Sequence, residues 1–272
     1  MARVTAPTAE VPHPLRARLW RLAPLLSIGL LLLGWEALAQ SGAFTPFVLP
    51  AFSAVAERIG HDAATGELFV NTGLTLYRAL VGFALAAVGG IALGMAMSRS
   101  VGIRWFFDPI ISVGFPMPKI AFLPIMILWL GFYDVSKISM IVFDAIFPVV
   151  TATIAGLAGV DRELVWSARN MGAKEPEILR QVLFPAALPM IMTGLQVALP
   201  IAMIVAVVTE MLMGGYGLGS GMMTASRFAD SRGVFAGIVE IAVVGYVLVK
   251  GMAWLRRRLL VWHQEALEPS TV

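Results

Sequence analysis

The sequence predicts an all-α integral membrane protein with six transmembrane helices, because it combines few charges with long apolar blocks. Apolar residues make up 58% of the 272 residues and charged residues only 14%, against roughly 25% charged residues in a soluble domain. Blocks of about 18 to 24 residues match the length that crosses a hydrocarbon core, whereas strands of a membrane barrel are shorter and alternate in polarity. The six blocks are Leu22–Ala39, Leu74–Met97, Ile110–Phe132, Ile138–Val160, Ala186–Thr209 and Val234–Leu255.

The first block, Leu22–Ala39, follows three closely spaced arginines, Arg16, Arg18 and Arg21. A basic segment before an apolar stretch is also typical of a cleaved signal peptide. Because this stretch continues through Glu36 to about the length of a full span, we interpret it as a retained first helix and keep a cleaved signal as the alternative.

The second block contains a segment of small residues that predicts close helix packing. Small side chains let two membrane helices approach each other closely. The same block carries a charged residue, Arg78, near its start. The small residues are Gly82, Ala86, Gly89, Gly90 and Gly94.

The third block carries Lys119 directly after Pro116, Met117 and Pro118. Prolines interrupt a helix and free backbone groups that can line a cavity. An ionisable residue within a membrane is a candidate functional residue by default. We therefore expect Lys119 and Met117 to lie beside a path for an anionic solute. The alternative is that Lys119 pairs with a carboxylate for structural reasons or extends to the membrane interface.

Four acidic residues lie within or directly after predicted spans. With the N-terminus inside, all four and Arg78 fall in the outer half of the membrane. Several carboxylates near one arginine predict interhelical ion pairs that close the outer mouth, with direct contact to a solute as the alternative. The four acids are Glu36, Asp144, Glu210 and Glu240.

The distribution of Lys and Arg predicts the orientation. If the N-terminus is cytoplasmic, about 14 of the 20 basic residues fall in inner segments and about 4 in outer segments, which is the positive-inside pattern. Both termini are then cytoplasmic, as a basic tail over residues 1–21 and a second tail over residues 259–272.

The longest inner loop, Asp161–Pro189, is patterned as a helical hairpin. Asp161 can cap a first helix, and Gly172 suits the position just after its end. Pro176 suits the first turn of a second helix, in which Glu177 and Arg180 are spaced to form an ion pair. The pattern predicts a short tip facing the cytoplasm. An amphipathic surface hairpin without a partner is the alternative.

This loop resembles the permease loop of ATP-binding-cassette importers, which reads Glu-Ala-Ala, three residues, Gly, nine residues, Ile-x-Leu-Pro. Here Trp166 to Ala168 occupy the first three positions, Gly172 the glycine, Val182 the isoleucine and Phe184-Pro185 the Leu-Pro. The spacing, the glycine, the third-position alanine and the proline match. Trp166 replaces the glutamate of the family pattern, so the contact of that glutamate is in doubt.

Other stretches resemble the nitrate/sulfonate/taurine-type permeases of that family. They are Asn71–Phe83, Phe115–Gly131, and Glu210 followed by Gly217-Leu218-Gly219. The resemblance covers roughly residues 66 to 263. It implies the type I importer fold of the methionine and maltose permeases, with a first helix and outer segment over residues 22–65. A core domain over residues 66–258 then contains the coupling loop at 161–185.

The resemblance also implies partners and a location. The permease would form a dimer, with a second copy or a close paralogue, in the bacterial inner membrane. Two cytoplasmic ATPase subunits and a periplasmic binding protein would serve it, with no nucleic-acid partner, and a small sulfonate-like or nitrate-like anion would be transported. The hairpin residues that would contact the ATPase are Ala168, Arg169, Met171, Gly172, Ala173, Lys174 and Glu175. The path or gate residues are Lys119, Arg78, Asp144, Glu210 and Met117.

The composition argues against catalysis by this chain. It has no cysteine and three dispersed histidines, which excludes a thiolate metal site and a cysteine nucleophile, so no cofactor is expected. The glycine-rich stretch Gly214–Gly221 lacks the lysine of a phosphate-binding loop. An intramembrane hydrolase is therefore disfavoured. An ion-coupled carrier that works without an ATPase remains the alternative, although it gives the loop pattern no role.

Overall fold

The computed structural model describes the backbone of residues 14–262, all of it helical or loop within that range. Residues 1–13 and 263–272, which include most of the two predicted cytoplasmic tails, lie outside the described residues. The elements are α1 (Pro14–Gln40), α2 (Phe52–Ala64), α3 (Glu67–Arg99), α4 (Val101–Gly114), a 3-10 turn η1 (Lys119–Phe122), α5 (Leu123–Leu130), α6 (Asp134–Ala158), α7 (Arg162–Asn170), α8 (Glu175–Ile178), a π-helical segment η2 (Leu179–Leu183), α9 (Phe184–Met213), α10 (Leu218–Arg227) and α11 (Ser231–Leu259).

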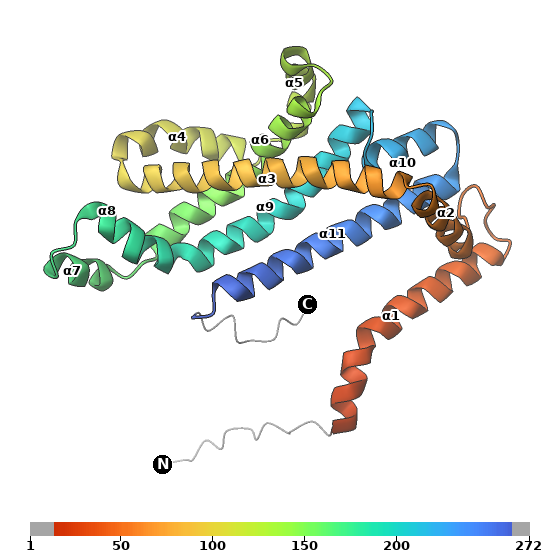
Figure 1. The fold of residues 1–272 in the computed structure, drawn as a ribbon, viewed down its shortest axis with the longest axis horizontal. Helices are drawn as coiled ribbons and strands as arrows, with labels where there is room; N and C mark the ends of the chain where they lie inside the picture. Colours follow the sequence, from red (N-terminus) through yellow and green to blue (C-terminus); the bar gives the residue numbers. More distant parts are fainter. Residues whose placement is uncertain (1–13, 263–272) are drawn as a thin grey trace.

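Four long apolar helices run along the length of the molecule (Figure 1). They are α3, α6, the continuous run from α8 to α9, and α11, and each is long and apolar enough to cross a membrane. Their positions agree with the second, fourth, fifth and sixth predicted blocks. The described apolar part of α1, Leu26–Gln40, is shorter.

The third predicted span is not one continuous helix, so the expectation for Ile110–Phe132 needs correction. The structure has α4 ending at Gly114, a break over residues 115–118, and then η1 and α5, and the two arms are bent by 101°. The cause is the pair Pro116 and Pro118, because proline lacks the N–H and restricts the residue before it. The predicted interruption of the helix by these prolines is confirmed.

Glycines hold α3 and α6 together at the core of the bundle. A Cβ added to Gly82 would lie 2.5 Å from Ile141, and one added to Gly90 would lie 2.8 Å from Val149. Gly94 stands equally close to Thr153. The close packing predicted for this segment is therefore present, and α9 packs on the same side of α6 to complete the core.

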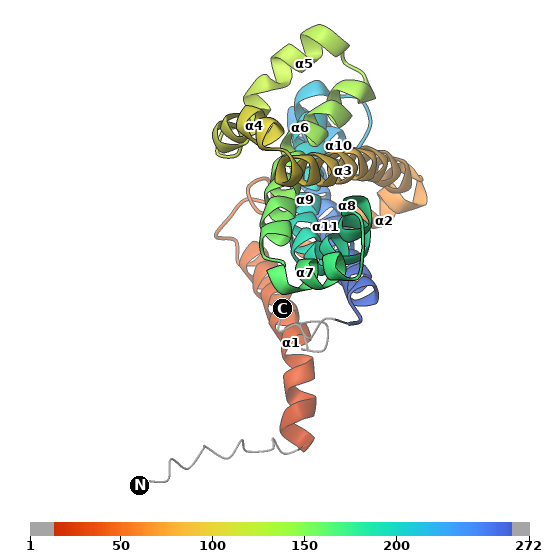
Figure 2. The ribbon, with the colours of Figure 1, turned by 90° about the vertical axis from the view of Figure 1, so that its left-hand side faces the viewer.

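The first helix, α1, leaves the bundle and contacts it at one end only (Figures 1 and 2). There Trp35 packs against Phe52 and Phe235 and donates to the carbonyl of Pro50 at 3.0 Å. Glu36 accepts hydrogen bonds from the backbone and side chain of Ser53. Glu36 thus fixes α1 to α2 and takes no part in the predicted ion-pair cluster.

Candidate functional site

The predicted hairpin consists of α7, the turn at Gly172, and α8, and it projects at the end of the bundle where α3 and α11 also end (Figure 1). Gly172 has a φ of +85°, a left-handed conformation that costs a residue with a Cβ about 1–2 kcal/mol. The N–H of Ala173 donates to the carbonyl of Ala168, which closes the helix end. The predicted helix–turn–helix hairpin is present.

The tip of the hairpin is exposed and carries both apolar and charged side chains. Met171 is 81% exposed and Trp166 is 59% exposed, whereas Ala168 is buried. Of the predicted contact residues, Ala168 therefore packs inside the hairpin and Met171 is the most accessible large apolar one. A large exposed apolar side chain such as Met171 on a short turn is suited to contact with a protein partner.

Glu175 fastens the hairpin to the bundle. Its carboxylate accepts from Arg169 of α7 at 2.8 Å and from Arg99 at the end of α3 at 3.0 Å. Glu177 accepts from the N–H of Lys174 and so caps α8, rather than pairing with Arg180 as its spacing predicts. A π-helical segment, η2, follows directly, and such segments occur frequently at functional sites.

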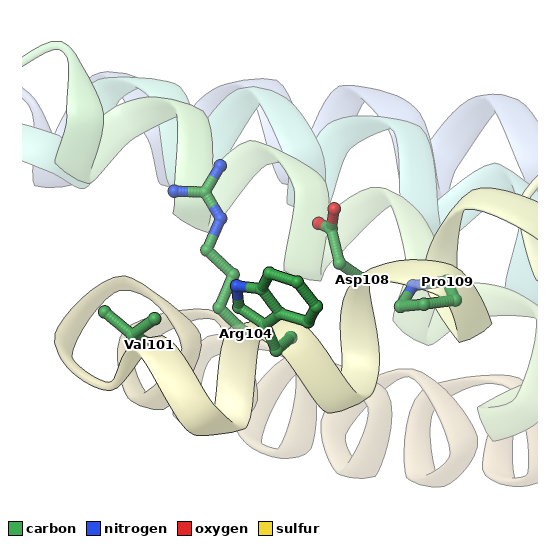
Figure 3. Close-up of a pocket in the computed structure, with 5 residues that line it drawn as sticks. Val101, Arg104, Asp108 and Pro109 are labelled. Carbon is green, nitrogen blue, oxygen red and sulfur yellow. The ribbon is translucent and has the colours of Figure 1, made fainter.

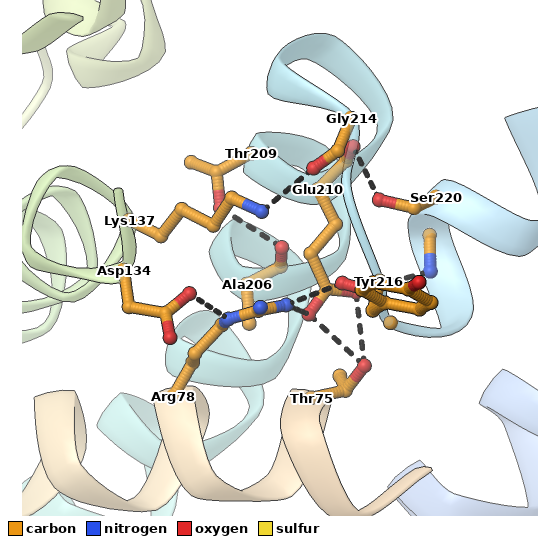
Figure 4. A network of polar contacts seen from close by, with 12 residues as sticks. Thr75, Arg78, Asp134, Lys137, Ala206, Thr209, Glu210, Gly214, Tyr216 and Ser220 are labelled. Atoms are coloured by element: carbon orange, nitrogen blue, oxygen red, sulfur yellow. Dashed lines mark hydrogen bonds and ion pairs between the residues drawn. The ribbon is translucent and has the colours of Figure 1, made fainter. Parts of the chain in front are cut away.

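A second group of charged side chains, drawn in Figure 4, joins α3, the start of α6 and the end of α9. Arg78, Lys137 and Glu210 are buried, and Asp134 is partly exposed. Glu210 is fully buried and accepts from Arg78 at 2.6 Å and from Thr75 at 2.9 Å. Arg78 also donates to Asp134 at 2.7 Å and to the carbonyl of Tyr216 at 2.7 Å. The predicted pairing of Arg78 with an acid of the outer half is present for Glu210.

This network holds the glycine-rich turn between α9 and α10. Lys137 donates to the carbonyl of Gly214 at 2.8 Å, and the N–H of Gly219 donates to Glu210 at 3.1 Å. A Cβ on Gly217 would lie 2.4 Å from the Glu210 carboxylate, so only glycine allows this approach. The turn Gly214–Gly219 is thus tied to α3, α6 and α9 at once.

Two members of this network were not predicted as site residues. Asp134 and Lys137 stand in the first turn of α6, outside the apolar block that the sequence marks. The Lys137 side chain is nevertheless buried. The sequence signal for these two residues is that they form a short charged stretch directly before a predicted span.

Lys119 and Asp144 form an ion pair at 3.0 Å, next to the break between α4 and η1. The Lys119 ammonium also donates to the carbonyl of Phe115 and lies 4.8 Å from the centre of the Phe147 ring. The Lys119 side chain is buried. The paired alternative for Lys119 is the arrangement that the structure shows, and Met117 lies half-buried in the adjoining break.

A hollow of about 310 Å³ is lined by residues of α6 and α9 and by Phe115. Phe115 forms its edge, and Thr151 and Thr193 contribute hydroxyl groups to an otherwise apolar wall. Asp144 lies two turns from Thr151 along α6. The Lys119–Asp144 pair is therefore close to a concave surface of the bundle.

Glu240 and Asp230 lie apart from both charged sites. One carboxylate oxygen of Glu240 is buried without a hydrogen-bond partner among the described residues, so Glu240 does not join the Arg78 network as predicted. Asp230 forms an ion pair with Arg58 of α2 at 2.5 Å and caps α11 through the N–H of Gly233. No group of three potential metal-ligating side chains exists within residues 14–262.

The sequence and the fold are similar to those of known transport proteins. Residues 86–261 match the family model described as binding-protein-dependent transport system inner membrane component. The chain is 34% identical over 250 residues to the aliphatic sulfonates transport permease protein SsuC of Bacillus subtilis (strain 168), a match that covers 92% of this chain and 91% of the relative. It is also 34% identical over 250 residues to the taurine transport system permease protein TauC of Escherichia coli (strain K12), covering 88% and 90%.

Two solved structures share the fold. A chain of the inward-facing MetNI methionine ABC transporter superposes with a TM-score of 0.57 at 17% identity, covering 70% of this chain and 98% of that one. A chain of an amino acid ABC transporter superposes with a TM-score of 0.59 at 17% identity, covering 72% and 94%. The methionine-permease-like helical architecture that the sequence predicts is confirmed at this level.

Proposed function

Because the chain belongs to the family of binding-protein-dependent transport system inner membrane components, we propose that it is one subunit of a dimeric importer for a small sulfonate. As a permease of this family it is the membrane component of an ATP-binding-cassette system and not itself an enzyme. Its system includes an ATPase and a binding protein. The dimer, its stoichiometry and its solute are the proposed parts.

The observation that carries the proposal is the hairpin of residues 161–185. Its spacing matches the family loop, its turn requires a left-handed glycine, and its tip exposes the side chain of Met171. Two cytoplasmic ATPase subunits, one for each permease, would each receive one hairpin. A rigid hairpin fixed to α3 through Glu175 can transmit the closure of the ATPase dimer to the membrane helices.

The proposed topology has six spans with both termini in the cytoplasm. Five come from α3, the bent unit of α4 and α5, α6, α9 and α11, and α1 supplies the sixth. The hairpin end of the bundle carries Arg99, Arg169 and the basic run Arg256–Arg258, which supports placing this end inside. The Arg78–Glu210 network then lies on the outer side.

The two buried ion pairs have different proposed roles in transport. The Arg78–Glu210 pair holds the outer turn Gly214–Gly219 and would act as part of an outer gate. The Lys119–Asp144 pair, with Met117, would support the wall of the solute path rather than bind solute directly, because its ammonium is already paired.

The solute class follows the relatives. Both similar permeases are named for sulfonates, one for aliphatic sulfonates and one for taurine. A sulfonate is a small anion, and its recognition before delivery would belong to the periplasmic binding protein. We therefore propose a small sulfonate as the transported solute.

Reconstitution tests this function directly. The purified permease, its ATPase and its binding protein are placed in liposomes, and uptake of radiolabelled ethanesulfonate and 2-aminoethanesulfonate is measured. We expect uptake of at least one of them only when ATP and both partners are present. Uptake by the permease alone, driven by an ion gradient, would instead identify an ion-coupled carrier and overturn the proposal.

A further inference from the structure

Helix α4 carries two charged side chains, Arg104 and Asp108, that have no ionic partner. They lie one turn apart and project from the same side of the helix (Figure 3). Neither Arg104 nor Asp108 takes part in an ion pair within the described part of the chain. Both side chains are exposed.

The helical repeat places these charges on a defined face of α4. At about 100° per residue, Arg104, Asp108 and Ser112 form one polar stripe. The buried face, with Ile111 and Gly114, lies directly beside it and packs against Phe147 of α6. On the far side of the helix an exposed apolar stripe is formed by Phe106, Ile110 and Val113.

One hollow lies along α4, and a second one lies beyond its C-terminal end. The first, of about 500 Å³, is lined by Val101, Arg104, Trp105, Asp108 and Pro109 (Figure 3). The second is the hollow of about 310 Å³ on α6 and α9, whose edge is Phe115, the residue that follows α4. Helix α4 therefore leads from one hollow to the other.

Unpaired charges cannot face the hydrocarbon of a membrane without a cost of several kcal/mol, so such residues face water or protein. The apolar stripe of α4 can contact lipid or a neighbouring chain, and the polar stripe can contact water. We propose that Arg104, Asp108 and Ser112 line the inner half of the solute path, which continues along Thr151 and Thr193. This inference rests on the proposed function and adds a solute-contacting subsite to it.

The chemistry of the subsite defines the solute class. A guanidinium binds an oxyanion through two parallel hydrogen bonds, and a carboxylate binds an ammonium. Side chains one helical turn apart are separated by about 5–6 Å at their Cβ atoms, a distance that a two-carbon spacer can bridge. The exposed ring of Trp105 adds an attractive face for a cation. The pair of Arg104 and Asp108 therefore fits a small dipolar acid with an oxyanion at one end and an ammonium at the other.

The absence of cysteine makes the path directly testable by labelling. Single variants Ser112→Cys and Val113→Cys are prepared in the complete complex in membrane vesicles, and a hydrophilic thiol reagent is added from the cytoplasmic side. Because only a thiolate in water reacts, we expect Ser112→Cys to react at least about tenfold faster than Val113→Cys. Val113 is a matched control, one residue along the same helix on the apolar stripe.

Two labelling results would overturn the path. One is an equal rate at the two positions, which would mean that the polar stripe does not face water. The other is reaction at Ser112→Cys that depends on the phospholipid headgroups of the vesicles and not on solute, which would assign the stripe to lipid. Slowing of the reaction by 2-aminoethanesulfonate would support the subsite.

Transport by charge variants tests the solute class. The variant Asp108→Asn removes the partner of the ammonium and leaves Arg104 in place. We expect it to lower the maximal uptake of 2-aminoethanesulfonate by about tenfold, the effect of one charge-assisted hydrogen bond, with little change for ethanesulfonate. Arg104→Gln should lower both. Equal effects of Asp108→Asn on the two solutes would overturn the dipolar class.

These experiments distinguish failure of the path along α4 from failure of the proposed function. If the wild-type complex takes up neither sulfonate, the proposed solute fails, while labelling of Ser112→Cys still decides whether the stripe lines an aqueous path. If uptake is dependent on ATP and binding protein but Ser112→Cys is unreactive, the importer function stands and the path along α4 is overturned.

Discussion

At the scale of single residues, Glu210 is the most constrained charge in the protein. It is fully buried, pairs with Arg78, and accepts hydrogen bonds from Thr75 and from Gly219. Removing one member of a buried pair strands the other, because the remaining charge keeps its desolvation cost without a partner. The stability of this network therefore depends on Glu210 and Arg78 together.

The variant Glu210→Gln is expected to destabilise the permease by about 3 kcal/mol, as other broken buried pairs do. Thermal unfolding in detergent measures it. Glu240→Gln is the matched control, because one oxygen of Glu240 is buried without a hydrogen-bond partner within residues 14–262 and an amide is less costly to bury than a carboxylate. A loss for Glu240→Gln equal to that for Glu210→Gln would contradict the assigned network.

The ion pair between Arg58 and Asp230, called the clasp below, lies outside the membrane spans. It predicts that the stability of the folded protein depends on pH. Burial alone would raise the pKa of Asp230, but hydrogen bonds from the N–H of Gly233 and from Arg58 hold this pKa below its ordinary value of 3.8. A lowered pKa in the folded state contributes stability above the unfolded pKa, and that stability is lost as the pH falls through the folded value.

The unfolding temperatures of the wild type and of Asp230→Asn should therefore differ at pH 6 and converge towards pH 3. A difference that is constant from pH 6 to pH 3 would show that the Asp230 charge has no part in the clasp.

At the scale of elements, the sequence predicted the long helices and the hairpin well, and it missed the contacts between distant elements. Apolar length located α3, α6, α9 and α11, and the proline pair located the break in the third span. The partner of Arg78 in Asp134 could not be found in the same way, because it lies about 56 residues along the chain. Only the packing of α3 on α6 brings the two together.

The glycines between α3 and α6 give a sharp test of this packing. In Gly90→Ala the new Cβ would lie 2.8 Å from the Cβ of Val149, whereas in Gly89→Ala the nearest atom, of Ile146, is 3.6 Å away. Overpacking of a tight core costs about 1–3 kcal/mol. We expect a lower unfolding temperature for Gly90→Ala and little change for Gly89→Ala, and equal values would contradict the α3–α6 contact.

The hairpin turn offers a test of coupling that does not depend on steric room. No atom lies within 4 Å of a Cβ added to Gly172, so only its φ of +85° restricts the residue. Asparagine tolerates this conformation and valine does not. In the reconstituted complex, Gly172→Val should lower uptake per ATP hydrolysed far more than Gly172→Asn. Equal, normal coupling in both would show that the turn geometry is not required.

At the scale of the whole molecule, the hairpin and the Arg78–Glu210 network lie at opposite ends of the bundle, and α3 contacts both. Its residue Arg99 contacts Glu175 of the hairpin, and its residue Arg78 contacts Glu210. At about 1.5 Å per residue, these two arginines are about 30 Å apart on one helix that is packed tightly on α6. The sequence predicted Arg78, Glu210 and Glu175 as site residues, but neither Arg99 nor this common scaffold. The helix ends become neighbours of other elements only in the folded chain.

The central claim is that the hairpin tip contacts the ATPase that drives transport. Met171→Cys and Leu128→Cys, two positions that are both 81% exposed, are each labelled with a photoactivatable thiol reagent in the assembled complex. The account predicts a cross-link from position 171 to the ATPase and none from position 128 on α5. A cross-link from neither position, or labelling of position 171 by an impermeant reagent from the outer side of the membrane, would contradict it.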